Sequence, residues 1–235
     1  VSIYSSAVLE YKKVMQLIVN APTEILPNKS ILMIGDSLTA ASIYPGKVLT
    51  FSNNDSLDFV LHGSSQVDTR DEGVFHEGYG GWKYIDFLEK LPVEDPLSYR
   101  DVKSPFLYLN SLNEYELNFD QYKTDVLGGK DPDIITILLG INDCFSFQSD
   151  DESLDIRIDR IITYSNRLVA LLKNAYPAAK VIVCVPPPPN KSNEIFIEKY
   201  GDLYPRLNWI IVLQKYQRKL LEYSTADTIC QSHLD

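Results

Sequence analysis

The sequence has no run of about 18 apolar residues, so it contains no segment long enough to cross a membrane as a helix. Basic residues are outnumbered: 22 Lys and Arg stand against 32 Asp and Glu, for a formal net charge of -10. Proteins that bind the phosphate backbone usually carry the opposite sign, so the charge argues against a nucleic-acid partner. A solvated acidic surface is the simplest interpretation of this charge.

Cysteine is also scarce. Cys144, Cys184 and Cys230 are widely spaced and form no Cys-x-x-Cys pair, which fits neither a disulfide framework nor a zinc site. The sequence therefore implies no metal and no organic cofactor. It carries no signature of an oligomeric state.

The chain has 235 residues, 45% of them hydrophobic and 23% charged, enough for one α/β domain with a full core. Residues 1–22 do not resemble the start of such a domain. They hold short β-prone runs at 1–4 and 11–19, although 7–19 is also compatible with one helix. We interpret 1–22 as a remnant strand pair of an upstream β module and 23–235 as the main domain.

Apolar runs rich in β-branched residues predict the strands of that domain. They occupy residues 31–34, 57–61, 133–139 and 180–185, with a weaker run at 228–231. Continuous runs of this length suit strands buried on both faces of a parallel sheet.

Two stretches predict amphipathic helices. The first begins after Ser153 as N-cap, and the second covers residues 207–223. The apolar positions of the first recur at helical spacing: Leu154, Ile158, Ile161, Ile162, Leu168, Leu171 and Leu172. Residues 88–130 are interpreted as an excursion with one or two short elements. Alternating strands and helices predict a doubly wound α/β sheet.

Three polar motifs follow different predicted strands. They are Gly35-Asp36-Ser37-Leu38, Gly78-Tyr79-Gly80-Gly81-Trp82 and Gly140-Ile141-Asn142-Asp143. Taken singly, the first motif also fits a helix cap, the second a glycine-rich turn with a tryptophan in the core, and the third an Asn-Asp turn. Taken together they converge, because the carboxyl ends of parallel strands meet at one edge of the sheet. A serine hydroxyl, a free backbone N–H and an amide donor are what acyl transfer requires.

These motifs, in this order and spacing, resemble the first three sequence blocks of the SGNH (GDSL-type) hydrolases. The resemblance covers roughly residues 28–235. The residues around the motifs, among them His76-Glu77-Gly78-Tyr79-Gly80-Gly81-Trp82, are similar to those of a bacterial branch of the family that is often associated with carbohydrate esterases. The resemblance implies a flavodoxin-like three-layer α/β/α fold with strand order 2-1-3-4-5. It also implies Ser37 as nucleophile and oxyanion donor, Gly81 as second donor and Asn142 as third.

The fourth block of the family, Asp-x-x-His, is not reproduced. The late histidine is His233, and Cys230 stands where the family has Asp. The resemblance leaves two options: His233 is the base, with Asp227 or Asp235 as its partner, or the base lies in residues absent from this sequence. The second option makes the domain one that lacks its C-terminal end.

The resemblance implies a serine esterase that removes acetyl or another short acyl group from a saccharide ester. His76 and Trp82 are candidate substrate contacts, with a turn hydrogen bond and core packing as their respective alternatives. A lipid esterase or thioesterase, and a non-catalytic carbohydrate-binding module on the same scaffold, are the alternative functions.

Overall fold

The computed structural model describes residues 2–5, 8–12, 28–66, 72–95, 101–189, 192–201 and 205–223. Its centre is a parallel sheet of β3 (Ser30–Gly35), β4 (Val60–His62), β8 (Ile134–Leu138) and β9 (Lys180–Val183), in the order β4-β3-β8-β9. A short strand, β5 (Glu77–Gly78), pairs with β3 beyond the end of β4. β3, β4, β8 and β9 correspond to the first, second, third and fourth predicted strands. The observed order is therefore 2-1-3-4, which confirms the predicted order for these four strands. The predicted strand at 228–231 lies outside the described residues.

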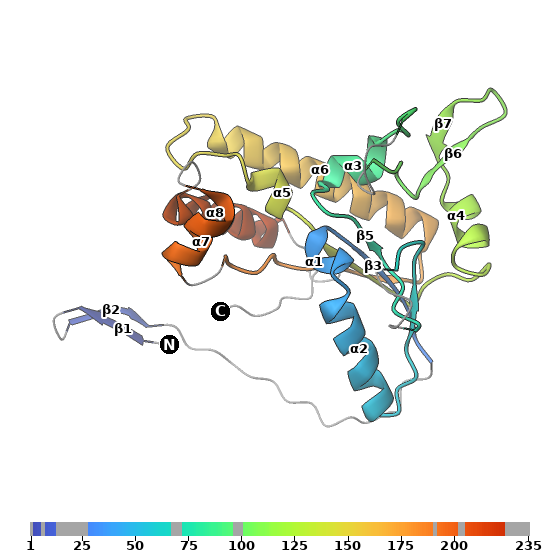
Figure 1. Ribbon diagram of the computed structural model, residues 1–235, viewed down its shortest axis with the longest axis horizontal. Helices are drawn as coiled ribbons and strands as arrows, with labels where there is room; N and C mark the ends of the chain where they lie inside the picture. The colour runs from blue at the N-terminus through green and yellow to red at the C-terminus, as the bar shows by residue number, and fades with distance from the viewer. Residues whose placement is uncertain are drawn as a thin grey trace.

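The strands form two hydrophobic cores because their side chains alternate between the two faces of the sheet. Leu32, Ile34, Ile135 and Ile137 belong to the larger core, which is covered by α3 (Tyr84–Glu89), α6 (Leu154–Ala175) and α8 (Arg206–Glu222). Ile31, Met33 and Leu61 face the other way and pack on α2 (Ile43–Asn54). The sheet thus lies between two helical layers (Figure 1).

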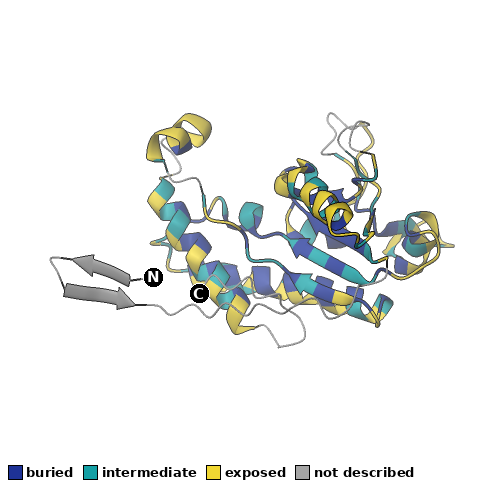
Figure 2. Ribbon diagram, turned by 90° about the horizontal axis from the view of Figure 1, so that it is seen from below, coloured by how far each residue is buried: buried dark blue, intermediate teal, exposed yellow. Residues whose placement is uncertain are grey.

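Helix α6 follows the predicted apolar spacing. Its buried residues form one stripe, and the helix begins directly after Ser153, as predicted. The hydroxyl of Ser153 does not cap the helix, however; Asp151 accepts hydrogen bonds from both the N–H and the hydroxyl of Ser153. Figure 2 shows the same division across the molecule, with buried residues on the sheet and on the inward sides of the helices.

The remaining elements are short. Residues 88–130 contain the antiparallel pair β6 (Leu107–Leu109) and β7 (Tyr115–Leu117) and helix α4 (Phe119–Asp125), besides the end of α3. Helices α1 (Ser37–Ala40), α5 (Ile141–Cys144) and α7 (Asn193–Tyr200) complete the domain. No helix of the described residues is long and apolar enough to span a membrane.

Near the N-terminus, β1 (Ser2–Ser5) and β2 (Val8–Lys12) form an antiparallel pair. The strand pair predicted for this region is therefore present, with its second strand starting earlier than expected. That the pair belongs to an upstream module stays a prediction.

Candidate active site

Ser37 is the first residue of α1, directly beyond the carboxyl end of β3. The turn is tight: a Cβ on Gly35 would lie 1.8 Å from the Oγ1 of Thr39, so only glycine fits. Asp36 caps the helix by accepting a hydrogen bond from the N–H of Leu38 at 2.9 Å. Ser37 itself is exposed, so its hydroxyl faces the space beyond the sheet edge.

Asp36 is fully buried, and its second carboxylate oxygen has no hydrogen-bond partner in the described structure. Burial raises the pKa of this carboxyl to about 6, although the hydrogen bond from Leu38 lowers it in part. Asp36 therefore fixes the backbone beside the serine from the interior, and its carboxylate is not offered to solvent.

The glycine-rich loop begins where β5 ends. Gly78 is in register with Gly35, and a Cβ on Gly78 would lie 2.5 Å from the backbone N of Ala40. This close approach brings the loop against α1. Gly81 is exposed with a φ of +83°. Neither the N–H of Ser37 nor that of Gly81 is bonded to another described residue, so both are available as donors.

Asn142 lies in α5, which follows β8. Its side-chain amide donates a hydrogen bond to the carbonyl of Trp82 at 3.0 Å. An amide nitrogen carries two hydrogens, so one remains for a further acceptor. The hydrogen bond also fixes the residue that follows Gly81, and thereby ties the glycine-rich loop to α5.

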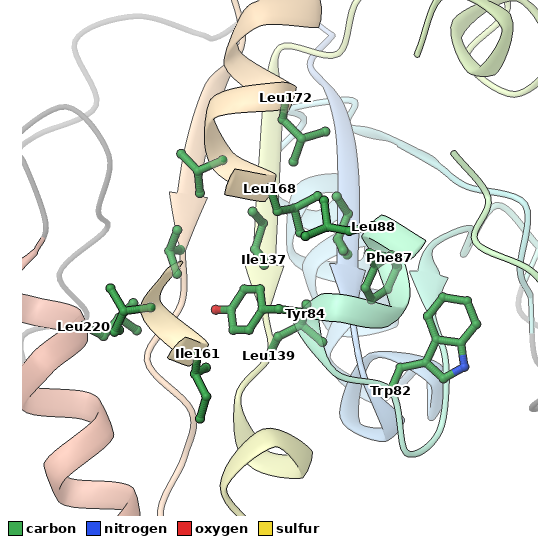
Figure 3. Close-up of a cluster of buried hydrophobic side chains, with 14 of the residues drawn as sticks. Trp82, Tyr84, Phe87, Leu88, Ile137, Leu139, Ile161, Leu168, Leu172 and Leu220 are labelled. Carbon is green, nitrogen blue, oxygen red and sulfur yellow. The ribbon is translucent and has the colours of Figure 1, made fainter. Parts of the chain in front are cut away.

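Asp143 forms a second contact between α5 and the segment that follows the glycine-rich loop. Its carboxylate accepts a hydrogen bond from the backbone N–H of Tyr84, at the start of α3, while its other oxygen is buried without a partner. Burial, the largest influence, raises the pKa of this carboxyl to about 7. Two consecutive residues of α5, Asn142 and Asp143, therefore hydrogen-bond to the backbone of Trp82 and Tyr84. Figure 3 shows the Tyr84 ring among Ile137, Leu139 and Ile161, which anchors this segment in the core.

Two cavities meet at Ser37. The larger has a volume of about 790 Å³ and the smaller about 270 Å³. The described residues that line the larger cavity are Ser37, Ala40, Ala41, Ser64, Ser65, Gln66, Gly78, Tyr79, Gly80, Val102, Lys103 and Pro105. Those that line the smaller one are Ser37, Leu38, Ile141, Phe145, Pro187, Pro188, Pro189, Phe196, Tyr200 and Trp209.

A family model described as GDSL-like Lipase/Acylhydrolase matches residues 31–226, most of the chain. The chain belongs to this family. Membership makes the protein a hydrolase and confirms the resemblance that its motifs indicated.

Solved structures that match the chain include a gut microbial diltiazem-metabolizing enzyme, the acetyl xylan esterase AlAXEase and the family 3 carbohydrate esterase of Clostridium thermocellum. Their sequence identities are 11%, 15% and 14%, and their TM-scores 0.49, 0.41 and 0.45. The matches cover 84%, 82% and 84% of this chain, and 35%, 74% and 75% of those chains. The chain thus spans about a third of the first. No curated protein sequence matches the chain.

Within this GDSL-family chain, the structure brings the first three predicted blocks to one edge of the sheet. Gly35 pairs with Gly78 on one side and with Leu138 on the other, which places the three following segments side by side. Gly80 lines the larger cavity together with Ser37, and Gly81 follows it in the chain. Asn142 reaches the same loop through Trp82.

The two candidate substrate contacts, His76 and Trp82, lie in the interior of the described structure. His76 is fully buried, its Nδ1 accepts a hydrogen bond from the N–H of Gly78, and its Nε2 lies 2.8 Å from the hydroxyl of Ser42. Trp82 is 2% exposed and stacks on Tyr79 at 4.1 Å between ring centroids. Both side chains hold the loop in place from the interior, in line with the alternatives of a turn hydrogen bond for His76 and core packing for Trp82. The fourth candidate of the catalytic set, His233, lies outside the described residues.

A buried hydrogen-bond network centred on Glu77, beside the larger cavity, was not predicted from the sequence. The Glu77 carboxylate accepts hydrogen bonds from the N–H and hydroxyl of Ser64 and from the hydroxyls of Tyr79 and Tyr122, at 2.5–2.9 Å. Burial raises the pKa of this carboxyl, and the four donors act against that rise. Ser64 and Tyr79 of this network also line the larger cavity. Only the fold brings Tyr122 to Glu77.

Proposed function

We propose that this protein is a serine esterase that hydrolyses a short acyl ester of a saccharide through an acyl-Ser37 intermediate. The observation that carries the proposal is the position of Ser37 where two cavities meet, beside the segment that holds Gly81 and Asn142. The N–H of Ser37 is bonded to no other described residue. One cavity can take each side of an ester, with the reacting carbonyl between them.

In this mechanism the hydroxyl oxygen of Ser37 attacks the carbonyl carbon and gives its proton to a base. The oxyanion that forms accepts hydrogen bonds from the N–H groups of Ser37 and Gly81 and from the amide of Asn142. Collapse of the tetrahedral intermediate expels the alcohol, which takes up the proton. Water then attacks the acyl-serine by the reverse sequence of steps and releases the acid.

The base is proposed to lie outside the described residues. His76 is buried with both ring nitrogens in use, and His62 pairs with Leu32 in the middle of β3, away from the edge that holds Ser37. His233 is the candidate for this role. Replacing it with Gln should abolish the histidine-dependent rise of activity near pH 6.5; an unchanged pH profile would assign the base elsewhere.

The saccharide side of the proposal is supported by the polar groups on the larger cavity. Ser64, Tyr79 and Lys103 supply two hydroxyls and an ammonium group. Desolvated sugar hydroxyls need such partners, because an unpaired buried polar group is costly.

The test compares wild type with Ser37→Ala on p-nitrophenyl acetate and on an acetylated saccharide. Loss of the nucleophile should lower turnover by at least about a thousandfold on both. Ser111→Ala, an exposed serine in the turn between β6 and β7, is the matched control and should act like wild type. Near-normal turnover by Ser37→Ala would place the chemistry elsewhere.

A further inference from the structure

The buried ring of His76 joins two segments of the site. The N–H of Gly78 donates a hydrogen bond to its Nδ1 at 3.1 Å, so Nδ1 carries no hydrogen. The neutral ring therefore carries its hydrogen on Nε2, which donates to the hydroxyl oxygen of Ser42 at 2.8 Å. Ser42 stands 34 positions away in the sequence, whereas Gly78 is a near neighbour. Each ring nitrogen thus has one fixed role.

The backbone of His76 is held as well. Its N–H donates to the carbonyl of Ser65 at 3.0 Å, and its carbonyl accepts a hydrogen bond from the N–H of Ser65 at 3.1 Å. Gly63 packs directly against this backbone, since a Cβ there would lie 2.3 Å from the carbonyl carbon of His76. The ring therefore projects from a fixed point, and it can hold the groups that it contacts in place.

The Ser42 end of this connection leads to the nucleophile. The N–H of Ser42 donates to the carbonyl of Thr39 in α1 at 2.9 Å, and its carbonyl accepts from the N–H of Gly46 in α2 at 2.9 Å. Its φ of 57° is a left-handed conformation that a serine adopts at some cost. The hydroxyl of Ser42 does not cap α2 and bonds to His76 instead. Ser42 thereby connects the ring to α1, whose first residue is Ser37.

The Gly78 end leads to the second backbone donor. Directly after Gly78, the N–H of Trp82 donates to the carbonyl of Tyr79 at 3.2 Å and closes a four-residue turn. Gly81 is the third residue of this turn, and its φ of +83° is of the kind that a type II turn requires there. The turn fixes the direction of the Gly81 N–H. The bond from Gly78 to His76 fixes where the turn begins.

The two backbone donors of the proposed oxyanion hole thus stand on separate segments, and an error of about 1 Å in such a site can cost about a hundredfold in rate. We propose that His76 is a positioning residue for ester hydrolysis: its neutral ring ties the segment of Ser37 to the loop of Gly81 and sets the spacing of their N–H groups. The inference rests on the proposed function and adds to it a residue that acts through Ser42 and Gly78.

Two replacements of His76 each keep one of its contacts. In His76→Asn the amide oxygen stands where Nδ1 was and still accepts from Gly78, but the side chain is too short for Ser42. In His76→Gln the amide nitrogen reaches Ser42, and the N–H of Gly78 loses its acceptor. Both variants should lower kcat for p-nitrophenyl acetate at least about fivefold and leave KM within about twofold, because the spacing of the donors acts in the transition state.

The value of kcat is expressed per active site titrated with a fluorophosphonate, so that unfolded protein does not contribute. A wild-type kcat in both His76 variants, or an effect confined to KM, would overturn the inference. Ser42→Ala deletes one oxygen and tests the same connection from its other end. It should also lower kcat at least about fivefold. A wild-type kcat in this variant would overturn the inference even if neither His76 variant folds.

The double variant Ser42→Ala/His76→Asn tests whether the two residues act through one bond. Both single changes remove the hydrogen bond between Ser42 and His76, and that bond can be lost only once. The kcat of the double variant should therefore lie within about twofold of the lower single variant. Independent effects would multiply to at least about 25-fold, and that result would contradict the connection.

His62→Asn is the matched control, because His62 pairs with Leu32 in the sheet, away from the edge that holds Ser37. It should keep kcat within about twofold of wild type, and a loss equal to that of His76→Asn would contradict a specific role for His76. The proposed function fails separately, if turnover persists in Ser37→Ala. Turnover that depends on Ser37 but keeps its kcat in the His76 variants refutes the inference alone.

Discussion

Asp143→Asn tests whether the carboxylate that holds the start of α3 is a buried charge. Asp143 is 7% exposed, and one of its oxygens has no partner in the described structure. Asn keeps an oxygen for the N–H of Tyr84 and removes the charge. A pKa raised from 3.8 to about 7 corresponds to about 4 kcal/mol opposing ionisation, at about 1.4 kcal/mol for each pKa unit.

The sign of the pH dependence follows from the direction of the shift. The folded state binds the Asp143 proton more tightly than the unfolded state, so this group stabilises the fold below pH 4. That contribution is lost as the pH rises towards about 7. Between pH 5 and pH 8 the loss is about 2.5 kcal/mol. Asp36, whose pKa is raised to about 6, acts in the same direction but is present in both proteins and cancels.

Urea unfolding of wild type and variant at pH 5 and pH 8 measures this term. The stability of Asp143→Asn relative to wild type should increase by about 2.5 kcal/mol from pH 5 to pH 8. Any constant effect of the new amide cancels in that difference. A relative stability that is equal at both pH values, within about 0.5 kcal/mol, would refute the assignment of a buried carboxylate with a raised pKa.

Three further substitutions probe the site and its support. Asn142→Ala should lower kcat by about 10²–10³ with a smaller change in KM, because an oxyanion donor acts in the transition state; an effect confined to KM would contradict this in steady-state assays. Gly140→Ala should unfold at a lower urea concentration than Gly128→Ala. Both glycines have a positive φ, but only at Gly140 would the new Cβ meet a ring, that of Tyr216, at 2.4 Å. Equal losses of unfolding free energy in the two variants would contradict the clash. Glu77→Gln should lose at least about 3 kcal/mol of unfolding free energy. Each carboxylate oxygen of Glu77 accepts two hydrogen bonds, and the amide nitrogen that replaces one oxygen can accept neither of its two. A loss below about 1 kcal/mol would contradict this role of Glu77.

The sequence was sufficient where the signal was local. Continuous apolar runs indicated β3, β8 and β9, and glycine at the ends of β3 and β8 reflects turns that a side chain would block. The strand order was predicted from the family resemblance. The stripe on α6 was evident because helical periodicity is a property of neighbouring positions.

What the sequence could not supply depends on distant partners. His76 was a candidate substrate contact because it stands next to the glycine-rich loop, with a turn hydrogen bond as the alternative. Its Nε2 lies 2.8 Å from the hydroxyl of Ser42, a partner 34 positions away that the local sequence does not indicate. Glu77 attracted no notice because Ser64 and Tyr122 reach it only in the folded chain. A two-residue strand such as β5 has too few positions to show a pattern, although it sets the register of the loop.

The most direct test of the central claim is covalent trapping of the nucleophile. A fluorophosphonate, which reacts with an activated serine hydroxyl, is incubated with the protein, and peptide mass spectrometry locates the adduct. We expect one adduct, on Ser37, which disappears in Ser37→Ala and persists in Ser111→Ala. An adduct on another residue, or ester hydrolysis that continues after Ser37 is fully labelled, would contradict it.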